Sequence, residues 1–245
     1  MIAYGKQSVG ATRRRAIDVA GDVFHKGEWM DSGQAPGLAP TVFLVEQGPE
    51  VLLQPHFHRQ NQFQLFVDGQ GTIGPEQIRP VTIHYAGAYT GYGPIKSGPE
   101  GLKYFTIRSA FESGLVPATE AREHMVRGPK RHAQAHVGAP LGAAQLAALE
   151  QVRRATVIEA NAGLGAELVQ LPPKASAAVA AIESSPGQFV VVLSGSARVG
   201  DVELQPWESA FVPATDGAAR LSAGQSGAEV LALHIPDQAP EYRAA

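Results

Sequence analysis

A segment in the first half of the chain resembles a segment in the second half, about 126 residues further along. Residues 61–74 read NQFQLFVDGQGTIG and residues 187–200 read GQFVVVLSGSARVG. The offset aligns Gln62 with Gln188, Phe63 with Phe189, Gly69 with Gly195, Gly74 with Gly200 and Pro80 with Pro206. Matched glycines and a proline at turn positions indicate a shared backbone path. We therefore expect the 245 residues to form two similar units.

Both copies of the repeat are predicted to be strand, turn, strand. Phe63, Leu65 and Val67 alternate with polar or outward positions, and Asp68-Gly69 marks a hairpin, as Gly195 does in the second copy. Residues 189–193 form a continuous apolar run, which is typical of a strand buried on both faces. With 27 Gly and 18 Pro, the chain favours many short elements. We predict an all-β fold of two small antiparallel barrels.

The residue composition changes between the two copies of the repeat. Residues 116–140 contain three prolines and the basic residues Arg127, Lys130 and Arg131, which is typical of a solvated linker. Residues 141–154 (LGAAQLAALEQVRR) have apolar spacing near 3.6 and predict a helix. The expected organisation is an N-terminal barrel over residues 1–115, a linker and short helix over 116–160, and a C-terminal barrel over 161–245.

Composition excludes several classes of function. The chain has 20 basic and 23 acidic residues, so its net charge of -3 gives no electrostatic reason to bind nucleic acid. No apolar run is long enough for a signal peptide or a membrane span, so we expect a soluble, cytoplasmic protein with no membrane partner. There is no cysteine. A metal site would therefore need histidine, carboxylate or amide ligands.

The residues most suggestive of chemistry lie just before the first repeat. On a strand, residues two apart share a face, so His56 and His58 would present their imidazoles to the same side. The same parity continues through Gln60, Gln62 and Gln64, while Phe57 and its apolar successors take the other face. This pattern predicts a strand whose polar face lines a cavity.

These residues resemble the first motif of the cupin superfamily. The match is His56-x-His58-x3-Gln62-x6-Gly69, with glutamine where the family usually has glutamate. A second family motif, Pro-x-Gly-x-x-His, is weakly similar to residues 91–95, with no histidine following. With the repeat, the chain resembles a two-domain cupin, or bicupin, of RmlC-like jelly-roll barrels (double-stranded β-helices). The resemblance implies a metal or small-molecule site in the first barrel and a degenerate second barrel, in a monomer or homodimer.

The repeat restricts which residues could be ligands. Shifting His56 and His58 by the offset lands on Ile182 and Ser184, so the second barrel is not expected to hold a metal. Gln62 recurs as Gln188 where no histidines accompany it, which leaves Gln64 as an alternative amide ligand. His84 has no counterpart, since Ala210 takes its place. We predict His84 as the third imidazole.

The remaining histidines are expected to be solvated: His124, His132, His136, His25 and His234. Four tyrosines cluster around the expected cavity mouth: Tyr85, Tyr89, Tyr92 and Tyr104. Without the family glutamate, proton abstraction would need a tyrosine, and Tyr89 and Tyr92 are the candidates. Arg59 and Arg108 could pair with the carboxylate of a ligand.

Two functions follow as hypotheses. The first is a metal-binding bicupin, an oxidoreductase of dioxygenase type that acts on a small organic molecule with Fe, Mn, Ni, Cu or Zn. The alternative is a non-catalytic cupin that binds or senses a small molecule without a metal. The sequence leaves open whether the protein is an enzyme.

Overall fold

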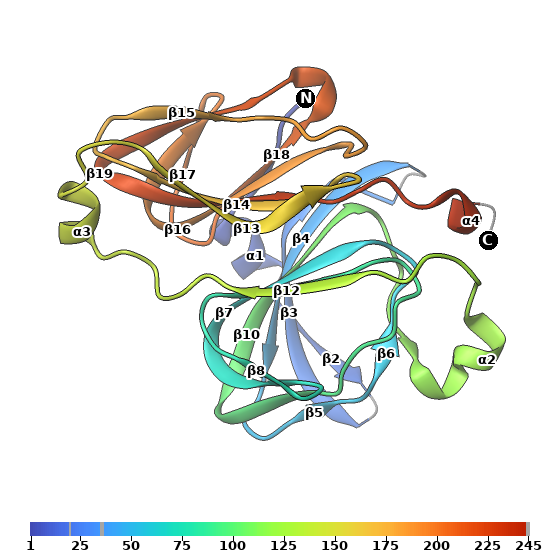
Figure 1. Ribbon diagram of the computed structural model, residues 1–245. Helices are drawn as coiled ribbons and strands as arrows, with labels where there is room; N and C mark the ends of the chain where they lie inside the picture. The colour runs from blue at the N-terminus through green and yellow to red at the C-terminus, as the bar shows by residue number, and fades with distance from the viewer. Residues whose placement is uncertain (20, 35–36, 244–245) are drawn as a thin grey trace. The chain divides into compact units, whose positions relative to one another are not determined.

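Long antiparallel strands make up most of the chain (Figure 1). The computed structural model describes residues 1–19, 21–34 and 37–243. The chain divides into two compact units. One comprises Gly10–Gly138 with Gln238–Ala245, and the other comprises Met1–Val9 with Ala139–Asp237. We call them the 10–138 unit and the 139–237 unit.

The 10–138 unit is built on one large antiparallel sheet with strand order β12-β9-β7-β10-β4-β3-β2. Short strands β5 and β8 pair with β10 and β7, and β6 pairs separately with β11. The elements are β2 (Arg15–Val19), β3 (Asp22–Asp31), β4 (Leu38–Gln47), β5 (Leu52–Leu53), β6 (His56–Phe57), β7 (Gln62–Ile73), β8 (Glu76–Ile78), β9 (Thr82–Ala86), β10 (Ile95–Ala110), β11 (Val116–Pro117), η1 (Ala118–Glu120), α2 (Ala121–His124), β12 (His132–His136) and α4 (Pro240–Arg243).

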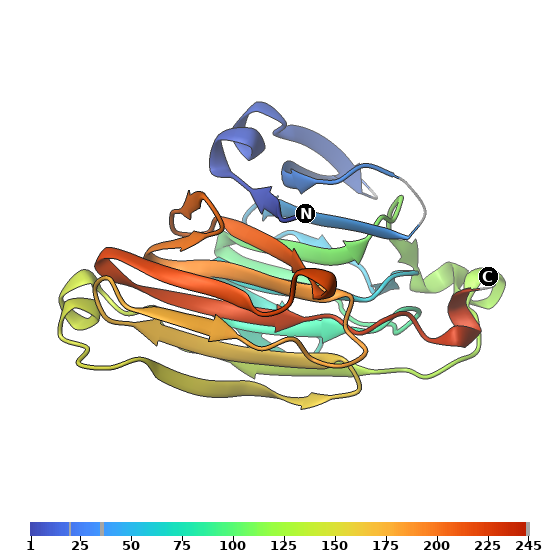
Figure 2. The same ribbon diagram turned by 90° about the horizontal axis from the view of Figure 1, so that it is seen from above.

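The 139–237 unit holds the second sheet, with strand order β1-β18-β16-β19-β14-β13. The orange to red strands of this sheet run side by side in both views (Figure 2). Its elements are β1 (Ala3–Gly5), α3 (Ala143–Ala147), β13 (Arg153–Asn161), β14 (Leu164–Leu171), β15 (Ser176–Val179), β16 (Gly187–Val199), β17 (Val202–Leu204), β18 (Ser209–Pro213), η2 (Ala214–Asp216) and β19 (Ala219–His234), and α1 (Gln7–Thr12) spans the junction of the units.

The sequence repeat reappears in the strand register. Gln62 is opposite Ala86 in the first sheet, and Gln188 is opposite Val212 in the second, each residue displaced by 126 positions. Gly69 opposite Leu102 likewise becomes Gly195 opposite Ala228. The two copies of the repeat therefore follow the same backbone path, as the matched glycines predicted.

The predicted hairpin at Asp68-Gly69 is wrong. Strand β7 runs through this dipeptide to Ile73, and the pairing with β10 slips by one residue between Phe66 and Asp68, which is a β-bulge. Gly69 has φ +77, and a Cβ there would lie 2.2 Å from the carbonyl oxygen of Gly101. Gly195 repeats this geometry against Gly227. Each glycine is required by its positive φ and by the close approach of the neighbouring strand.

The prediction of a β-rich fold is confirmed, but two closed barrels are not. In the described part of the chain, the hydrogen-bonded strand order of each large sheet has two ends and does not close on itself. Each unit nevertheless has its own apolar core. Phe24, Phe66 and Tyr104 belong to the core of the 10–138 unit, and Val190 and Val230 belong to that of the 139–237 unit. The run 189–193 is buried throughout, as predicted.

The segment between the repeats is more ordered than a linker. Strand β12 pairs with β9 and so extends the first sheet, while β11, η1 and α2 precede it. The predicted helix over residues 141–154 is limited to Ala143–Ala147, because Arg153 already pairs with Gln170 as strand β13 begins. Strand pairing overrides the helical spacing there. No helix among residues 1–19, 21–34 and 37–243 is long and apolar enough to cross a membrane.

Candidate functional site

Polar side chains follow one face of the first sheet. Residues directly opposite each other in antiparallel strands point to the same face. Gln134, His84, Gln64 and Thr106 are successive partners across β12, β9, β7 and β10. Gln62 and Arg108 lie two positions further along β7 and β10 on the same face. The sheet therefore presents a row of imidazole, amide and guanidinium groups.

The backbone brings Tyr92 beside His56. The His56 backbone N–H donates to the Tyr92 carbonyl at 3.1 Å, and the Tyr92 N–H donates to the His56 carbonyl at 3.0 Å. This isolated bridge places both rings on one side, with ring centroids 4.6 Å apart. His56 and Tyr92 are not part of a continuous pair of strands, so strand periodicity in the sequence could not predict this contact.

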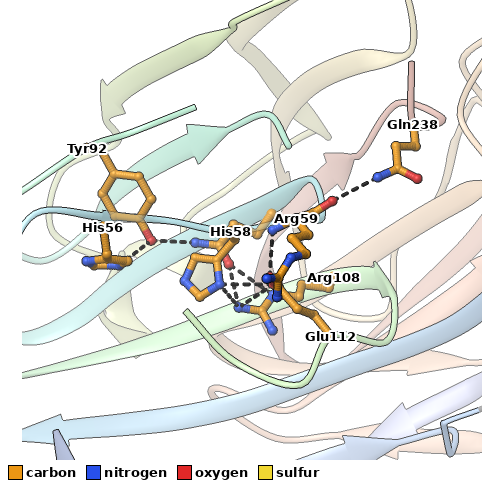
Figure 3. A network of polar contacts seen from close by, with 8 residues as sticks. His56, His58, Arg59, Tyr92, Arg108, Glu112 and Gln238 are labelled. Atoms are coloured by element: carbon orange, nitrogen blue, oxygen red, sulfur yellow. Dashed lines mark hydrogen bonds and ion pairs between the residues drawn. The ribbon is translucent and has the colours of Figure 1, made fainter. Parts of the chain in front are cut away.

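A directed chain of hydrogen bonds runs through Tyr92 (Figure 3). Nδ1 of His56 lies 2.8 Å from the Gln54 carbonyl oxygen, which can only accept, so Nδ1 carries the proton. Nε2 of the neutral ring then accepts from the Tyr92 hydroxyl at 3.0 Å. The Tyr92 oxygen accepts from Gln62 Nε2 at 2.6 Å. Arg108 donates to Gln62 Oε1 through Nε at 2.9 Å and Nη2 at 2.8 Å.

His58 is anchored by a carboxylate. Its Nδ1 lies 2.9 Å from Glu112 Oε2 and 3.0 Å from Arg108 Nη2. Arg108 and Glu112 form an ion pair at 3.4 Å, and their side chains are 5% and 3% exposed. The backbone N–H of Arg59 donates to the other Glu112 oxygen at 2.6 Å. We assign the His58 proton to Nδ1, where it donates to the ionised Glu112, so the contact between Nδ1 and Arg108 Nη2 is not a hydrogen bond.

Burial sets the charge states of this cluster. Burial, and after it the neighbouring His58, lowers the pKa of His56 to about 3. Burial and then the charge of Arg108 lower the pKa of His58. Burial raises the pKa of Tyr92 well above its ordinary value. Burial also opposes ionisation of Glu112, but the bond from His58 and the charge of Arg108 outweigh it, so the Glu112 pKa is lowered. At neutral pH, both rings and the phenol are uncharged.

His84 forms its hydrogen bond with a different partner from those of His56 and His58. Its Nδ1 is 3.1 Å from Gln64 Oε1, and its ring centroid is 4.9 Å from that of Tyr92. Burial lowers the pKa of His84 to about 4. Within the described ranges, no three His, Asp or Glu side chains are grouped closely enough to hold a metal ion. The structure therefore does not gather His56, His58 and His84 around one point.

Tyr89 and Gln60 are not part of the row of polar side chains on the first sheet. Tyr89 is 3% exposed and packs in an apolar cluster with Phe57 and Tyr242, with ring centroids at 5.9 and 4.8 Å. Gln60 lines a separate hollow with Tyr89. Of the two tyrosines predicted as proton acceptors, only Tyr92 contacts the histidine pair.

The other histidines differ in exposure. His124, His132 and His136 are exposed, as predicted, and His25 is half-buried. His234 was expected at the surface, but it is 3% exposed, and burial lowers its pKa to about 4. The reason is its position in β19, the central strand of the second sheet, where it lies opposite Gln188.

Two cavities adjoin the cluster. One, of about 370 Å³, is lined by His56, His58, Gln64 and Arg108 together with apolar side chains. The other, of about 1090 Å³, is lined by Tyr92 and His84 and by His132 and His136 of β12. The cluster is therefore accessible to small molecules from cavities of the size that ligand sites have.

The 139–237 unit lacks an equivalent cluster. Ile182, Ser184 and Ala210 stand 126 positions after His56, His58 and His84. Gln188 remains, but its Nε2 donates to the Gly217 carbonyl at 2.8 Å. His234 takes the place that corresponds to Arg108.

Several solved structures resemble this chain in fold. No protein-family model matches it, and no curated protein matches it in sequence. A deletion mutant of Bacillus subtilis oxalate decarboxylase OxdC is similar in structure, with a TM-score of 0.62 and 12% identity, over 93% of this chain and 76% of that one. A protein proposed to be a dioxygenase, from Nostoc punctiforme, has a TM-score of 0.56 and 12% identity, with 98% and 80% covered.

A third similar structure is the Escherichia coli pirin YhhW in complex with nickel(II). Its TM-score is 0.55 and its identity 14%, with 96% of this chain and 99% of that one covered. All three neighbours are cupin-fold proteins. The chain has a cupin fold. The oxalate decarboxylase contains Mn(II) centres, which together with the nickel complex shows that this fold accommodates divalent metals in those proteins.

Sequence reasoning missed Glu112 entirely. It lies just after β10, 54 residues from His58, and nothing in its local sequence marks it. The signal that could have found it is the burial of Arg108 on a strand face. A buried guanidinium needs a nearby carboxylate, and Glu112 is four residues further along the chain.

Proposed function

We propose that the 10–138 unit binds a divalent metal ion through Nε2 of His56 and Nε2 of His58, with the Tyr92 oxygen as a third donor. The observation that carries this proposal is the anchoring of both Nδ1 atoms, one on the Gln54 carbonyl and one on the Glu112 carboxylate. Metal-ligating histidines are held in this way, because the bond fixes the tautomer and leaves Nε2 with a lone pair for the metal.

The amides fit this role less well than the imidazoles. Gln62 Oε1 accepts two bonds from Arg108, and Gln64 Oε1 lies against His84 Nδ1. Their oxygens are thus directed at other partners. The ligands we propose are His56, His58 and Tyr92, with His84 and the two glutamines in the wall of the site. A set of nitrogen and oxygen donors suits Fe, Mn, Ni, Cu or Zn.

A first-row ion held there would supply Lewis-acid or redox chemistry to a small organic molecule in an adjoining cavity. The residues around it have separate tasks. Glu112 and Gln54 orient the two rings, and Arg108 orients Gln62. Because burial raises the pKa of Tyr92, the oxygen that it would present to the metal is that of a neutral hydroxyl at neutral pH.

The reaction we propose is an oxidation of dioxygenase type. One structure with this fold belongs to a protein proposed to be a dioxygenase, which is in keeping with this reaction. We further propose that the 139–237 unit has a structural role, as a degenerate copy of the first unit, since Ile182 and Ser184 stand where the two histidines would be.

Titration of chelator-treated protein with Mn(II) and with Ni(II), followed by calorimetry, tests the proposal. We expect one site per chain, abolished in His56→Ala/His58→Ala. The matched control is His132→Ala/His136→Ala, which removes two exposed histidines of the same unit and should bind as the unchanged protein does. Equal binding by both double variants, or no binding by the unchanged protein, would contradict it.

One observation favours a second candidate, a cupin that binds a small molecule without a metal. The buried Arg108 guanidinium lies 3.0 Å from His58 and opposes the approach of a cation. In that case the histidine and glutamine side chains would bind the ligand by hydrogen bonds alone. Absence of metal binding in the titration, with retained binding of an organic ligand, selects this function.

A further inference from the structure

The 370 Å³ cavity has an apolar body and a charged wall. Its apolar lining includes Phe24, Phe43, Val45, Leu53 and Tyr104. Lys26 and Arg108 contribute the inner positive charges, and Glu112, which pairs with Arg108, contributes the inner negative charge. Arg15 and Asp18 also line it but are exposed at its rim. An apolar cavity with a few convergent polar groups is typical of a site for a small organic ligand.

Two cations lie against one aromatic ring. Lys26 Nζ is 4.0 Å from the centroid of the Phe43 ring, and Arg108 Cζ is 5.5 Å from it. Burial lowers the pKa of Lys26, and the charges of Arg15 and Arg108 lower it further. Both cations are therefore held in a place that an anion would stabilise.

The acidic partners of these cations are shared. Glu28 Oε1 lies 3.2 Å from Lys26 and 3.0 Å from Arg15. Glu112 accepts from His58 and from the Arg59 backbone as well as pairing with Arg108. Arg108 donates to Gln62 through Nε and Nη2, and within residues 1–19, 21–34 and 37–243 no hydrogen bond engages its Nη1. A buried guanidinium thus retains a donor for a ligand.

We propose that this cavity binds a small organic acid, whose carboxylate is held by Lys26 Nζ and Arg108 Nη1 and whose apolar body packs on Phe43, Phe24 and Leu53. The small organic acid is then the substrate class of the proposed function. Only its role as a substrate rests on that function, because binding of the acid does not depend on it. Guanidinium and ammonium donors recognise carboxylates by charge-assisted bonds, and the aromatic and aliphatic lining excludes strongly hydrated molecules.

Calorimetry with four probes tests the inference: benzoate and hexanoate, and their neutral isosteres benzamide and hexanamide. We expect both acids to bind at least about tenfold more tightly than their amides, because only the acids form charge-assisted bonds. Lys26→Met should weaken acid binding by about tenfold and leave the amides unchanged. Lys103→Met is the matched control, since Lys103 pairs with Asp68 on the surface and does not line the cavity.

Three results overturn the inference: equal binding of acids and amides, no binding of any probe, or an unchanged preference in Lys26→Met. If that variant does not fold, Lys26→Gln replaces it under the same criteria. Metal content measured on the same samples separates this inference from the proposed function. A metal-free protein that binds acids more tightly than amides supports the acid site and contradicts the proposed metal site. A metal-loaded protein that binds acids and amides equally supports the metal site and contradicts the acid site.

Discussion

The hydroxyl of Tyr92 lies 3.0 Å from Nε2 of His56 and donates its proton to that nitrogen. The same oxygen accepts from Gln62, so one phenol joins the histidine to the Arg108 network. Most of the chemistry we propose depends on this arrangement, because it fixes the tautomer of His56 and holds the oxygen of a neutral phenol beside its Nε2.

Tyr92→Phe tests the arrangement. Removing the hydroxyl leaves His56 Nε2 and Gln62 Nε2 without the partner they share, so we expect the free energy of unfolding to fall by about 1–3 kcal/mol. Metal affinity should also fall, since a proposed donor is lost. Urea unfolding and metal titration of the variant measure the two effects. An unchanged stability and an unchanged affinity together would show that Tyr92 only fills space.

The Arg108–Glu112 pair predicts a large penalty when only one member is removed. Glu112→Leu leaves a buried guanidinium without its carboxylate, which should cost about 3–5 kcal/mol of unfolding free energy. Arg108→Met/Glu112→Leu removes both charges and should recover a substantial part of that loss. Urea denaturation of the two variants gives the comparison. A double variant less stable than the single one would mean that the pair contributes more than charge compensation.

His234 predicts an acid-dependent loss of stability in the 139–237 unit. Its folded pKa of about 4 lies below the ordinary value of 6.5, so between these pH values the unfolded chain binds a proton that the folded chain does not. Stability from this group is complete above about pH 6.5 and should fall by about 2 kcal/mol by pH 5. His234→Leu should flatten this part of the pH profile of unfolding. A profile of unchanged slope would exclude His234 as the titrating group.

The two matched glycines of the repeat, Gly69 and Gly195, should respond alike to substitution. Gly69→Ala and Gly195→Ala each combine a positive φ with a Cβ placed 2.2 Å from a backbone oxygen. We expect each to cost about 2–4 kcal/mol, more than the strain of the left-handed conformation alone. Gly74→Ala is the control, since its φ is +54 but the nearest atom to the added Cβ, the carbonyl oxygen of Gly93, lies at an ordinary contact distance of 3.5 Å. It should cost about 1 kcal/mol. Thermal unfolding of the three variants ranks them.

The repeat and the histidine pair were the parts of this protein that sequence could predict. Strand geometry requires glycines and alternating apolar residues at particular positions, so the similarity of residues 61–74 and 187–200 is visible in the sequence itself. Gly69 was predicted to mark a hairpin because hairpin turns often need a residue with positive φ, and only the pairing of β7 with β10 shows that the strand continues through it.

The partners within the site depended on long-range contacts that no local pattern carries. Glu112 meets His58 across 54 residues, and Gln62 is turned towards Arg108 across 46. Residues 141–154 had helical spacing, yet their end pairs as strand β13. In each case tertiary pairing decided between states that the local sequence allowed equally.

The metal content of the purified protein tests the account most directly. Elemental analysis of protein expressed with a mixture of first-row metals, and purified without added metal, should give about one metal ion per chain. We expect His56→Ala/His58→Ala to retain less than about a tenth of that amount, because two of three proposed ligands are gone. We expect His132→Ala/His136→Ala to retain all of it. Negligible metal in all three proteins would contradict the proposed metal site.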